Sequence, residues 1–361
     1  MSKVIFSNKD NAFFQSLKTS VDEYFEKKKI AKTGDWRLFS KTFILVGGAI
    51  AIYLSLILLN LSTGFAILLC ILLGFFMAFI GFSVMHDANH GSYSANHKLN
   101  DFVGLTLNLL GASSFFWKQK HNILHHTYPN VDGLDDDIAK SPIIRQCESQ
   151  KWVPAHKVQH IYLTFIYALS PIFWVFIMDP TKYFTHKING TTLWKMSLKN
   201  HIIFWVTKVY YVFIFLVIPI LAWGWAGLVG YIITNMVLGV TLSFVFQLAH
   251  VVEGTEFESI GLDTTKHIET AWAVFQLKTT SNFAMHNKFI SWCVGGLNFQ
   301  VEHHLFPKIS HIHYPAISKI VQQKCKEFNV PYNYNNSLFG AIASHFKVMK
   351  DLGKSPTLAN A

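Results

Sequence analysis

Residues 42–85 read TFILVGGAIAIYLSLILLNLSTGFAILLCILLGFFMAFIGFSVM, a run of 44 residues that contains no Asp, Glu, Lys or Arg. One helix that crosses a membrane needs about 20 apolar residues, so this run is long enough for two crossings. The sequence NLSTG (60–64) interrupts the run with small and polar residues that are typical of a turn. The run therefore predicts a membrane hairpin of two helices, about residues 42–60 and 64–84.

A second charge-free run, Val209–Ala249, extends over 41 residues. It predicts two more helices, about residues 202–222 and 227–248, which turn near the sequence AWGWAG (222–227). The first of these helices begins before Lys208, whose long side chain we expect to extend its ammonium group to the membrane interface. The predicted fold class is an all-α integral membrane protein with four spanning helices in two hairpins and a helical cap.

The charges that flank the hairpins predict their orientation. Nine Lys and Arg residues precede or begin the first hairpin, and neither hairpin turn contains one. The positive-inside rule then places the N-terminus in the cytoplasm, and two complete hairpins return the chain to that side. We expect a basic cytoplasmic N-terminal segment (1–40), a membrane domain (41–325) and a cytoplasmic C-terminal tail (326–361) that is disordered after Lys350.

Two shorter apolar stretches are interpreted differently. Phe102–Trp117 is short for a membrane span, and Val158–Met178 contains Pro171. Both are interpreted as re-entrant or interfacial helices on the cytoplasmic face, where the predicted cap lies. The alternative is that one of them crosses the membrane, which would move part of the histidine-rich sequence to the opposite side. Aromatic residues 115–117 line a channel in one interpretation and form an interfacial belt in the other.

The composition agrees with a membrane protein and argues against an average soluble domain, a disulfide-rich protein and a cysteine zinc protein. Hydrophobic residues make up 51% of the 361 residues, with 32 Phe and 10 Trp, which is apolar for a soluble domain. The formal net charge of +10 suits an anionic membrane surface or nucleic acid, and the hydrophobic runs favour the membrane. The four cysteines form no CxxC pair, so neither a disulfide framework nor a cysteine zinc site is expected.

Three histidine clusters follow the predicted hairpins: HDANH (86–90), HNILHH (121–126) and QVEHH (300–304). Residues four apart share one face of a helix, whereas the last histidine of the second cluster is expected about 100° around it. In the third cluster Gln300 takes the place that a histidine holds in the second. One more histidine ends the last spanning helix. The candidate metal ligands are His86, His90, His121, His125, His126, His250, His303 and His304.

Eight histidines on one side of a membrane exceed the needs of one ion and match two. Imidazole suits iron, copper, zinc and nickel, and two redox-active ions beside a membrane cavity are suited to dioxygen activation and attack on a lipid C–H bond. The acidic stretch 132–137, Asp87 and Glu302 lie near these histidines. They are expected either to be solvated or to orient ligand histidines through the other ring nitrogen.

The remaining histidines are isolated, and all but His286, which stays open, are expected to play no part in the centre. These nine residues are His97, His156, His160, His186, His201, His267, His311, His313 and His345.

The three clusters, in this order around two hairpins, resemble the three histidine boxes of the membrane fatty acid desaturases, over roughly residues 40–325. The resemblance implies a non-haem di-iron site with the eight histidines as ligands, dioxygen as co-substrate and an acyl channel between helices. Gln300 in the third box is the pattern of the front-end subgroup, which adds a cis double bond between an existing one and the carboxyl end. Its carboxamide is expected to orient a water molecule or a neighbouring ligand rather than to bind iron.

Many eukaryotic front-end enzymes begin with a haem domain that contains His-Pro-Gly-Gly, and residues 1–40 contain no histidine. We therefore expect a separate electron donor, such as a ferredoxin or a soluble cytochrome, and a bacterial inner membrane as the location. The expected substrate is a fatty acyl chain on a lipid or on CoA, and no nucleic acid is expected to bind.

Alternatives are a di-iron lipid hydroxylase, a desaturase of sphingolipid long-chain bases and a membrane metal transporter. A transporter is expected to place its ligands near the bilayer midplane, not at helix ends.

Overall fold

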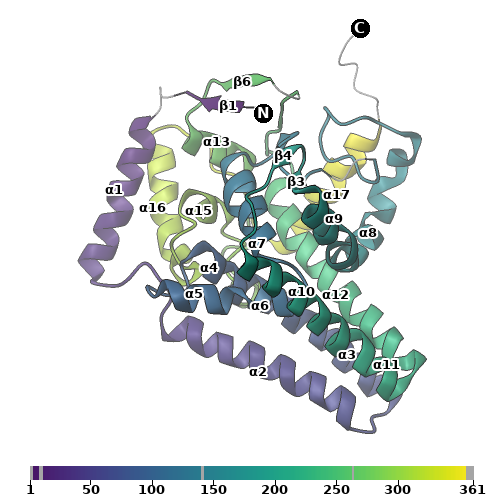
Figure 1. The fold of residues 1–361 in the computed structure, drawn as a ribbon. Coiled ribbons are helices and arrows are strands. Elements are labelled where there is room, and N and C mark those ends of the chain that lie inside the picture. The colour runs from purple at the N-terminus through teal and green to yellow at the C-terminus, as the bar shows by residue number, and fades with distance from the viewer. Residues whose placement is uncertain (1–2, 8–10, 140–141, 262–263, 355–361) are drawn as a thin grey trace.

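The computed structural model describes residues 3–7, 11–139, 142–261 and 264–354. Long helices extend from one side of a cap of shorter helices (Figure 1).

The helices predicted from the charge-free runs are present close to their predicted bounds. These helices are α2 (Trp36–Leu58), α3 (Thr63–Ile80), α10 (Leu198–Val212), α11 (Ile218–Trp223) and α12 (Trp225–His250). The second of them continues through a π-helical turn, η1 (Gly81–Met85), into α4 (His86–His90), and a second such turn, η5 (Phe213–Val217), joins α10 to α11. Each hairpin therefore ends at or next to a predicted ligand.

A further long helical stretch is present within Pro154–Thr185. It consists of η3 (Pro154–Val158), α8 (Gln159–Phe173), η4 (Trp174–Met178) and α9 (Asp179–Thr185). With it, five helical stretches of the described residues are long and apolar enough to cross a membrane. Helix α8 contacts both α12 and α17 (Leu338–Lys354), and Figure 1 shows it beside α17 among the cap helices.

Short helices form the cap. They are α1 (Asn11–Lys28), α5 (His97–Gly104), α6 (Thr106–Leu109), α7 (Ser114–Trp117), η2 (Lys118–His125), α13 (Trp272–Thr279), α14 (Lys288–Cys293), α15 (Gln300–Leu305), η6 (His311–His313) and α16 (Tyr314–Glu327). The stretch predicted as one interfacial helix, Phe102–Trp117, is thus divided between three of them.

Four two-stranded ladders, which the sequence does not predict, fasten loops of the cap. Three are parallel and one is antiparallel. The parallel pairs are β1 (Lys3–Phe6) with β6 (Thr265–Ile268), β2 (Val131–Asp132) with β5 (Glu258–Ser259), and β7 (Asn282–Phe283) with β8 (Tyr334–Asn335); the antiparallel pair is β3 (Lys187–Ile188) with β4 (Thr191–Thr192).

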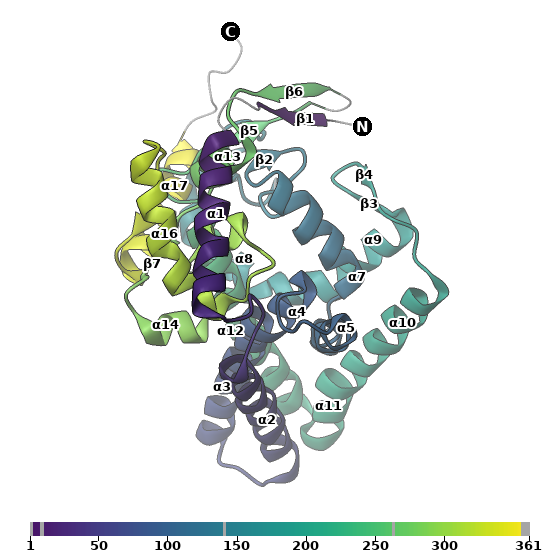
Figure 2. The same ribbon diagram turned by 90° about the vertical axis from the view of Figure 1, so that its left-hand side faces the viewer.

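The N-terminal segment is packed into the cap. Helix α1 buries Phe13, Leu17, Val21 and Phe25, which recur every four residues and form one apolar face. This face packs with α13, α15 and α16 in one core cluster, as Figure 2 shows for α1 and α16. The N-terminal segment therefore supports the helix that carries the third histidine box.

Close helix packing depends on two glycines in the long helices. A Cβ atom at Gly74 would lie 2.6 Å from the carbonyl oxygen of Thr234, and one at Gly239 would lie 2.4 Å from that of Tyr167. Neither separation is possible without a shift of backbone, so α12 touches both α3 and α8 at glycines.

The expectation for Lys208 is wrong. Its side chain is buried, and its ammonium group donates to the carboxylate of Asp179 at 3.0 Å and to the carbonyl oxygens of Gly111 and Val175. A buried ammonium group with a carboxylate partner does not need to reach water. That partner lies on α9, 29 residues earlier, where the sequence gives no sign of it.

The expected disorder after Lys350 is wrong for its first residues. Helix α17 continues to Lys354 and buries Ala341, His345 and Met349 at a spacing of four residues. This face packs against α8 and α12. Residues 355–361 lie outside the described part of the chain.

Candidate metal centre

All eight predicted metal ligands lie together in one buried region between the long helices and the cap. The exposed fraction of each side chain is 8% or less. They come from α4 (His86 and His90), η2 and the residue after it (His121, His125 and His126), the end of α12 (His250) and α15 (His303 and His304). Four segments that are far apart in the sequence therefore supply one cluster of imidazoles.

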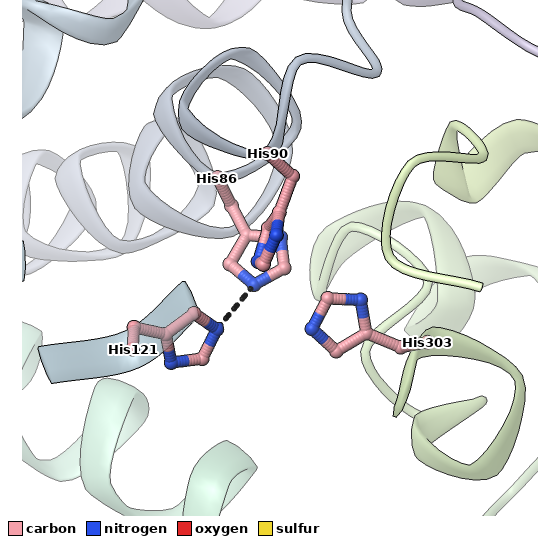
Figure 3. Close-up of side chains that lie close together, drawn as sticks. All are labelled: His86, His90, His121 and His303. Atoms are coloured by element: carbon pink, nitrogen blue, oxygen red, sulfur yellow. Dashed lines mark hydrogen bonds between the residues drawn. The ribbon is translucent and has the colours of Figure 1, made fainter. Parts of the chain in front are cut away.

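The first group of ligands comprises His86, His90, His121 and His303. Each offers one ring nitrogen, and these four atoms lie within 4.8 Å of one another. Figure 3 shows the four rings converging from α4, η2 and α15, with Nε2 of His86 only 3.3 Å from Nε2 of His121. This geometry suits four nitrogen ligands around one ion.

The second group comprises His125, His250 and His304, whose ring nitrogens also lie within 4.8 Å of one another. The ring of His126 lies between the two groups, with its centroid 4.5 Å from that of His303 and 4.4 Å from that of His304. The two groups are therefore adjacent, as a two-metal centre requires.

A π-helical turn brings His126 into the centre. The backbone N–H of His126 donates to the carbonyl oxygen of His121, five residues earlier, and Nε2 of His126 lies 3.3 Å from Nε2 of His121. The expected position of His126, about 100° around an α-helix, is wrong because η2 is not an α-helix. π-Helical turns are rare and occur frequently at functional sites.

Four of the rings make a contact through their outer nitrogen, Nδ1, which fixes their orientation. Nδ1 of His125 contacts Asp135 Oδ2 (3.0 Å), that of His250 the carbonyl oxygen of Thr279 (3.2 Å), that of His303 the hydroxyl of Tyr314 (3.0 Å), and that of His304 Oε1 of Gln276 (2.8 Å). With the ring N–H donated outward, Nε2 keeps its lone pair for the centre.

The residues present fit a metal. Several inward nitrogens are buried and have no hydrogen-bond partner among the described residues: Nε2 of His90, His125, His303 and His304, and Nδ1 of His126. Burial lowers the pKa of His303 and His304 well below its ordinary value, so these imidazoles are neutral. Unpaired buried nitrogens are unfavourable unless something binds them, and a metal ion is the ligand that neutral imidazoles share.

Comparisons with known proteins identify the family of the chain. The model of the fatty acid desaturase family matches residues 62–336. The chain belongs to the fatty acid desaturase family. It is therefore an oxidoreductase, and its histidine clusters are compatible with the histidine boxes of that family.

Similar desaturases cover most of the chain. The chain is 36% identical to an sn-1 linoleoyl-lipid 6-desaturase of Arthrospira platensis, over 98% of this chain and 96% of that protein. It is 34% identical to an sn-1 linoleoyl-lipid 6-desaturase of Synechocystis sp., over 98% of both. It is 35% identical to an acyl-lipid (8-3)-desaturase of Physcomitrium patens, over 94% of this chain and 72% of that protein.

Asp135 supports the second group of the desaturase. Its side chain is fully buried and accepts from the backbone N–H of Asn130 at 3.0 Å, in addition to its contact with His125. Burial lowers the pKa of His125, but the nearby carboxylates of Asp135 and Asp137 raise it above the ordinary value. The acidic stretch therefore holds a predicted ligand, as one of the two interpretations expects, and Asp135 is the residue that does so most directly.

The two carboxylates inside the boxes have other partners. Glu302 accepts from the amide of Asn282 at 2.8 Å and from the hydroxyl of Tyr332 at 2.9 Å, which fastens α15 to the β7–β8 region. Asp87 accepts from the hydroxyl of Ser310 at 2.7 Å. Within the described residues neither carboxylate hydrogen-bonds to the ring of a predicted ligand, so both instead hold their boxes against neighbouring segments.

Gln300 reaches the centre directly. Its side-chain nitrogen lies 3.1 Å from Nε2 of His250, and its side chain is buried. Because Nδ1 of His250 faces the carbonyl oxygen of Thr279, the contact involves the nitrogen that faces the metal groups. The carboxamide thus contacts a neighbouring predicted ligand, as expected for the Gln-type box.

Several residues of the site escape sequence reasoning. Thr279, Gln276 and Tyr314 hold ligand rings, yet none lies in a histidine box and nothing in their spacing marks them. Trp117 had a sequence signal, since it precedes the second box. Its indole stacks on His121 with a centroid distance of 4.3 Å, which places it at the centre rather than in an interfacial belt.

Proposed function

We propose that this desaturase is a di-iron, dioxygen-dependent acyl-lipid desaturase of the front-end type. The observation that carries the proposal is the pair of adjacent buried histidine groups at the ends of apolar helices. The overall reaction is –CH2–CH2– + O2 + 2 e⁻ + 2 H⁺ → –CH=CH– + 2 H2O, in which the acyl chain and the donor each supply two electrons.

The two groups would hold one iron each, with His126 between them. Bound iron supplies the dioxygen-dependent removal of two hydrogens from adjacent methylenes. An all-imidazole set with no cysteine suits iron and does not suit a structural zinc site.

The chain's own residues orient the ligands and exclude water. The acceptors on Asp135, Thr279, Gln276 and Tyr314 hold the ring N–H groups outward. Trp117 covers the first group beside His121. A dry, fixed set of ligands prevents side reactions at the centre and keeps the reacting methylenes in one position.

A cavity among the long helices is proposed to receive the methyl end of the acyl chain. It has a volume of about 520 Å³ and is lined mainly by apolar side chains of α2, α3, α11 and α12. Its lining includes Met77, nine residues before His86 on one continuous helical stretch, which corresponds to roughly 14 Å along the axis.

Gln300 and the similar proteins favour front-end regiochemistry. Two of the similar proteins are named linoleoyl-lipid 6-desaturases, so we propose a polyunsaturated or linoleoyl lipid as substrate in preference to acyl-CoA. The positions of the predicted ligands at helix ends and in the cap count against a metal transporter, whose ligands lie near the midplane. The hydroxylase and long-chain-base alternatives differ in product and substrate and are separated by product analysis.

The proposed topology is two hairpins, α2–α3 and α10–α12, with both termini and the cap in the cytoplasm. His86 and His250 end the two hairpins and meet in one centre, which supports hairpins that return to the same side. In this topology α8 lies along the cap without crossing. A bacterial inner membrane and a separate soluble electron donor complete the proposal.

Product analysis tests the proposal. The protein is expressed in a host with a compatible reductase, linoleic acid is supplied, and the fatty acids are identified by gas chromatography–mass spectrometry. The expected product has a new double bond on the carboxyl side, absent in a His303→Ala, His304→Ala control. A hydroxylated fatty acid would replace the proposal with the hydroxylase alternative.

A further inference from the structure

Lys41 is a buried cation at the start of the first long helix. Only 3% of its surface is exposed, although it lies at the boundary of the charge-free run where an ammonium group is expected to reach water. Its Nζ lies 5.0 Å from the ring centre of Trp292 and 3.5 Å from Nε2 of His311. Burial of a lysine is unfavourable unless the charge is compensated, so these contacts need a carboxylate beyond them.

His311 connects Lys41 to that carboxylate. The other ring nitrogen of His311, Nδ1, lies 3.0 Å from Oδ2 of Asp87, which is an ion-pair distance without hydrogen-bond geometry. The same oxygen accepts from the hydroxyl of Ser310 at 2.7 Å and from the backbone N–H of His311 at 3.2 Å. Lys41, His311 and Asp87 are each at most 6% exposed, so the three groups form one buried chain of opposite charges bridged by an imidazole.

The three residues of this charge network lie on three separate elements of the fold. Lys41 lies on α2, Asp87 lies between His86 and His90 on α4, and His311 begins η6, which follows the third box. The segment after the third box therefore contacts ligand-bearing elements at two points. Residues 310–311 hold α4 through Asp87, and Tyr314 holds the ring of His303.

We propose that Lys41, His311 and Asp87 form a positioning network that fixes the first box against the segment after the third box. This inference rests on the proposed two-metal function. Of the first group, His86 and His90 lie on α4, which contains Asp87 of the network, and His303 lies on α15, which precedes the segment that contains His311. The second group depends on other contacts, through Asp135, Thr279 and Gln276. The network therefore sets the metal affinity of the first group and leaves that of the second group unchanged.

Variants of Lys41 and His311 separate this role from general stability. Lys41→Met keeps the side-chain stem and removes the charge. His311→Ala removes the bridge, and His311→Asn places a polar amide near the position of Nδ1 and so is expected to recover part of the effect. His313→Gln is the matched control: it lies two residues away, is buried, and contacts the carbonyl oxygen of Thr33 and the ring of Phe25 rather than Asp87.

The measurement is a Co²⁺ titration of the full-length metal-free protein in detergent, followed by the visible absorption of the bound ion. The wild type is expected to bind two equivalents. In Lys41→Met and His311→Ala one of the two equivalents is expected to bind about tenfold more weakly, the order of effect seen when contacts behind a ligand are removed. The spectrum of the other equivalent is expected to stay as in the wild type, and His313→Gln is expected to match the wild type throughout.

Three other outcomes would overturn the inference. Unchanged titrations in Lys41→Met and His311→Ala would exclude a positioning role. Equal weakening of both equivalents, without recovery in His311→Asn, would indicate a general loss of structure. A wild type that binds fewer than two equivalents would instead contradict the proposed function on which the inference rests.

Discussion

Replacement of Asp135 by Asn tests how the second metal group is held. Oδ2 of Asp135 accepts from two donors, Nδ1 of His125 and the backbone N–H of Asn130, both at 3.0 Å, and Oδ1 accepts from the backbone N–H of Asp137 at 2.9 Å. An amide has only one oxygen, so in Asp135→Asn an NH2 group must face at least one N–H donor. An unsatisfied buried donor costs about 1–3 kcal/mol of folding free energy.

Asp135→Asn is also expected to weaken metal binding, in addition to its cost in folding free energy. Loss of a carboxylate behind a ligand histidine lowers metal affinity by roughly 10–100-fold. That change corresponds to about 1.4–2.8 kcal/mol of binding free energy. After dialysis against a chelator, we expect Asp135→Asn to retain less iron than the wild type, as measured by elemental mass spectrometry. We also expect the variant to melt at a lower temperature than the wild type.

Asp132→Asn is the matched control for this substitution. Asp132 lies in the same acidic stretch but accepts from Ser149 and Gln150, with no contact to a predicted ligand. It is expected to keep the wild-type metal content. Wild-type affinity and melting temperature in Asp135→Asn would refute the reasoning, because they would show that the buried carboxylate does not hold His125.

Three further predictions follow from individual contacts. Gln300→Ala removes the carboxamide that lies 3.1 Å from Nε2 of His250 and is expected to lower the yield of desaturated product. Gln300→His is expected to keep part of that yield. A full yield of product from Gln300→Ala would contradict a role for this side chain. Lys208→Met leaves the buried carboxylate of Asp179 without its ammonium partner. It is expected to lower the free energy of unfolding by about 3–5 kcal/mol and therefore the melting temperature in detergent. An unchanged melting temperature would contradict a buried ion pair. Burial lowers the pKa of His304, so its imidazole stays neutral in the folded protein while the unfolded chain takes up a proton near pH 6.5. The melting temperature of the metal-free protein is therefore expected to fall as the pH drops below about 6.5, and a melting temperature that stays constant between pH 7 and 5 would contradict it.

The long apolar helices could be predicted from the sequence because their signal is local. Charge-free runs fix the approximate bounds of α2, α3, α10–α11 and α12 without knowledge of the rest of the chain. The pairing of Lys208 with Asp179 could not be predicted, because it depends on how α9 and α10 pack. The continuation of α17 to Lys354 did carry a local signal, the spacing of four residues between Ala341, His345 and Met349, which the expectation of disorder after Lys350 overlooked.

The candidate ligands could likewise be predicted, since the histidine boxes are contiguous stretches of sequence. The residues that orient the rings could not be, because Gln276 and Thr279 become neighbours of the boxes only in the folded chain. His311 shows most clearly which site residues the sequence alone does not reveal. It stands alone in the sequence and was expected to play no part, yet in the structure it lies 3.0 Å from the carboxylate of the first box.

Mössbauer spectroscopy of the purified protein loaded with ⁵⁷Fe tests the central claim most directly. The account predicts two irons per chain, both high-spin with nitrogen ligands, one from each histidine group. It also predicts that a His303→Ala, His304→Ala variant, which removes one ligand from each group, loses this signal. A wild type that holds a single iron, or that retains zinc in preference to iron under the same loading, would contradict the two-iron centre.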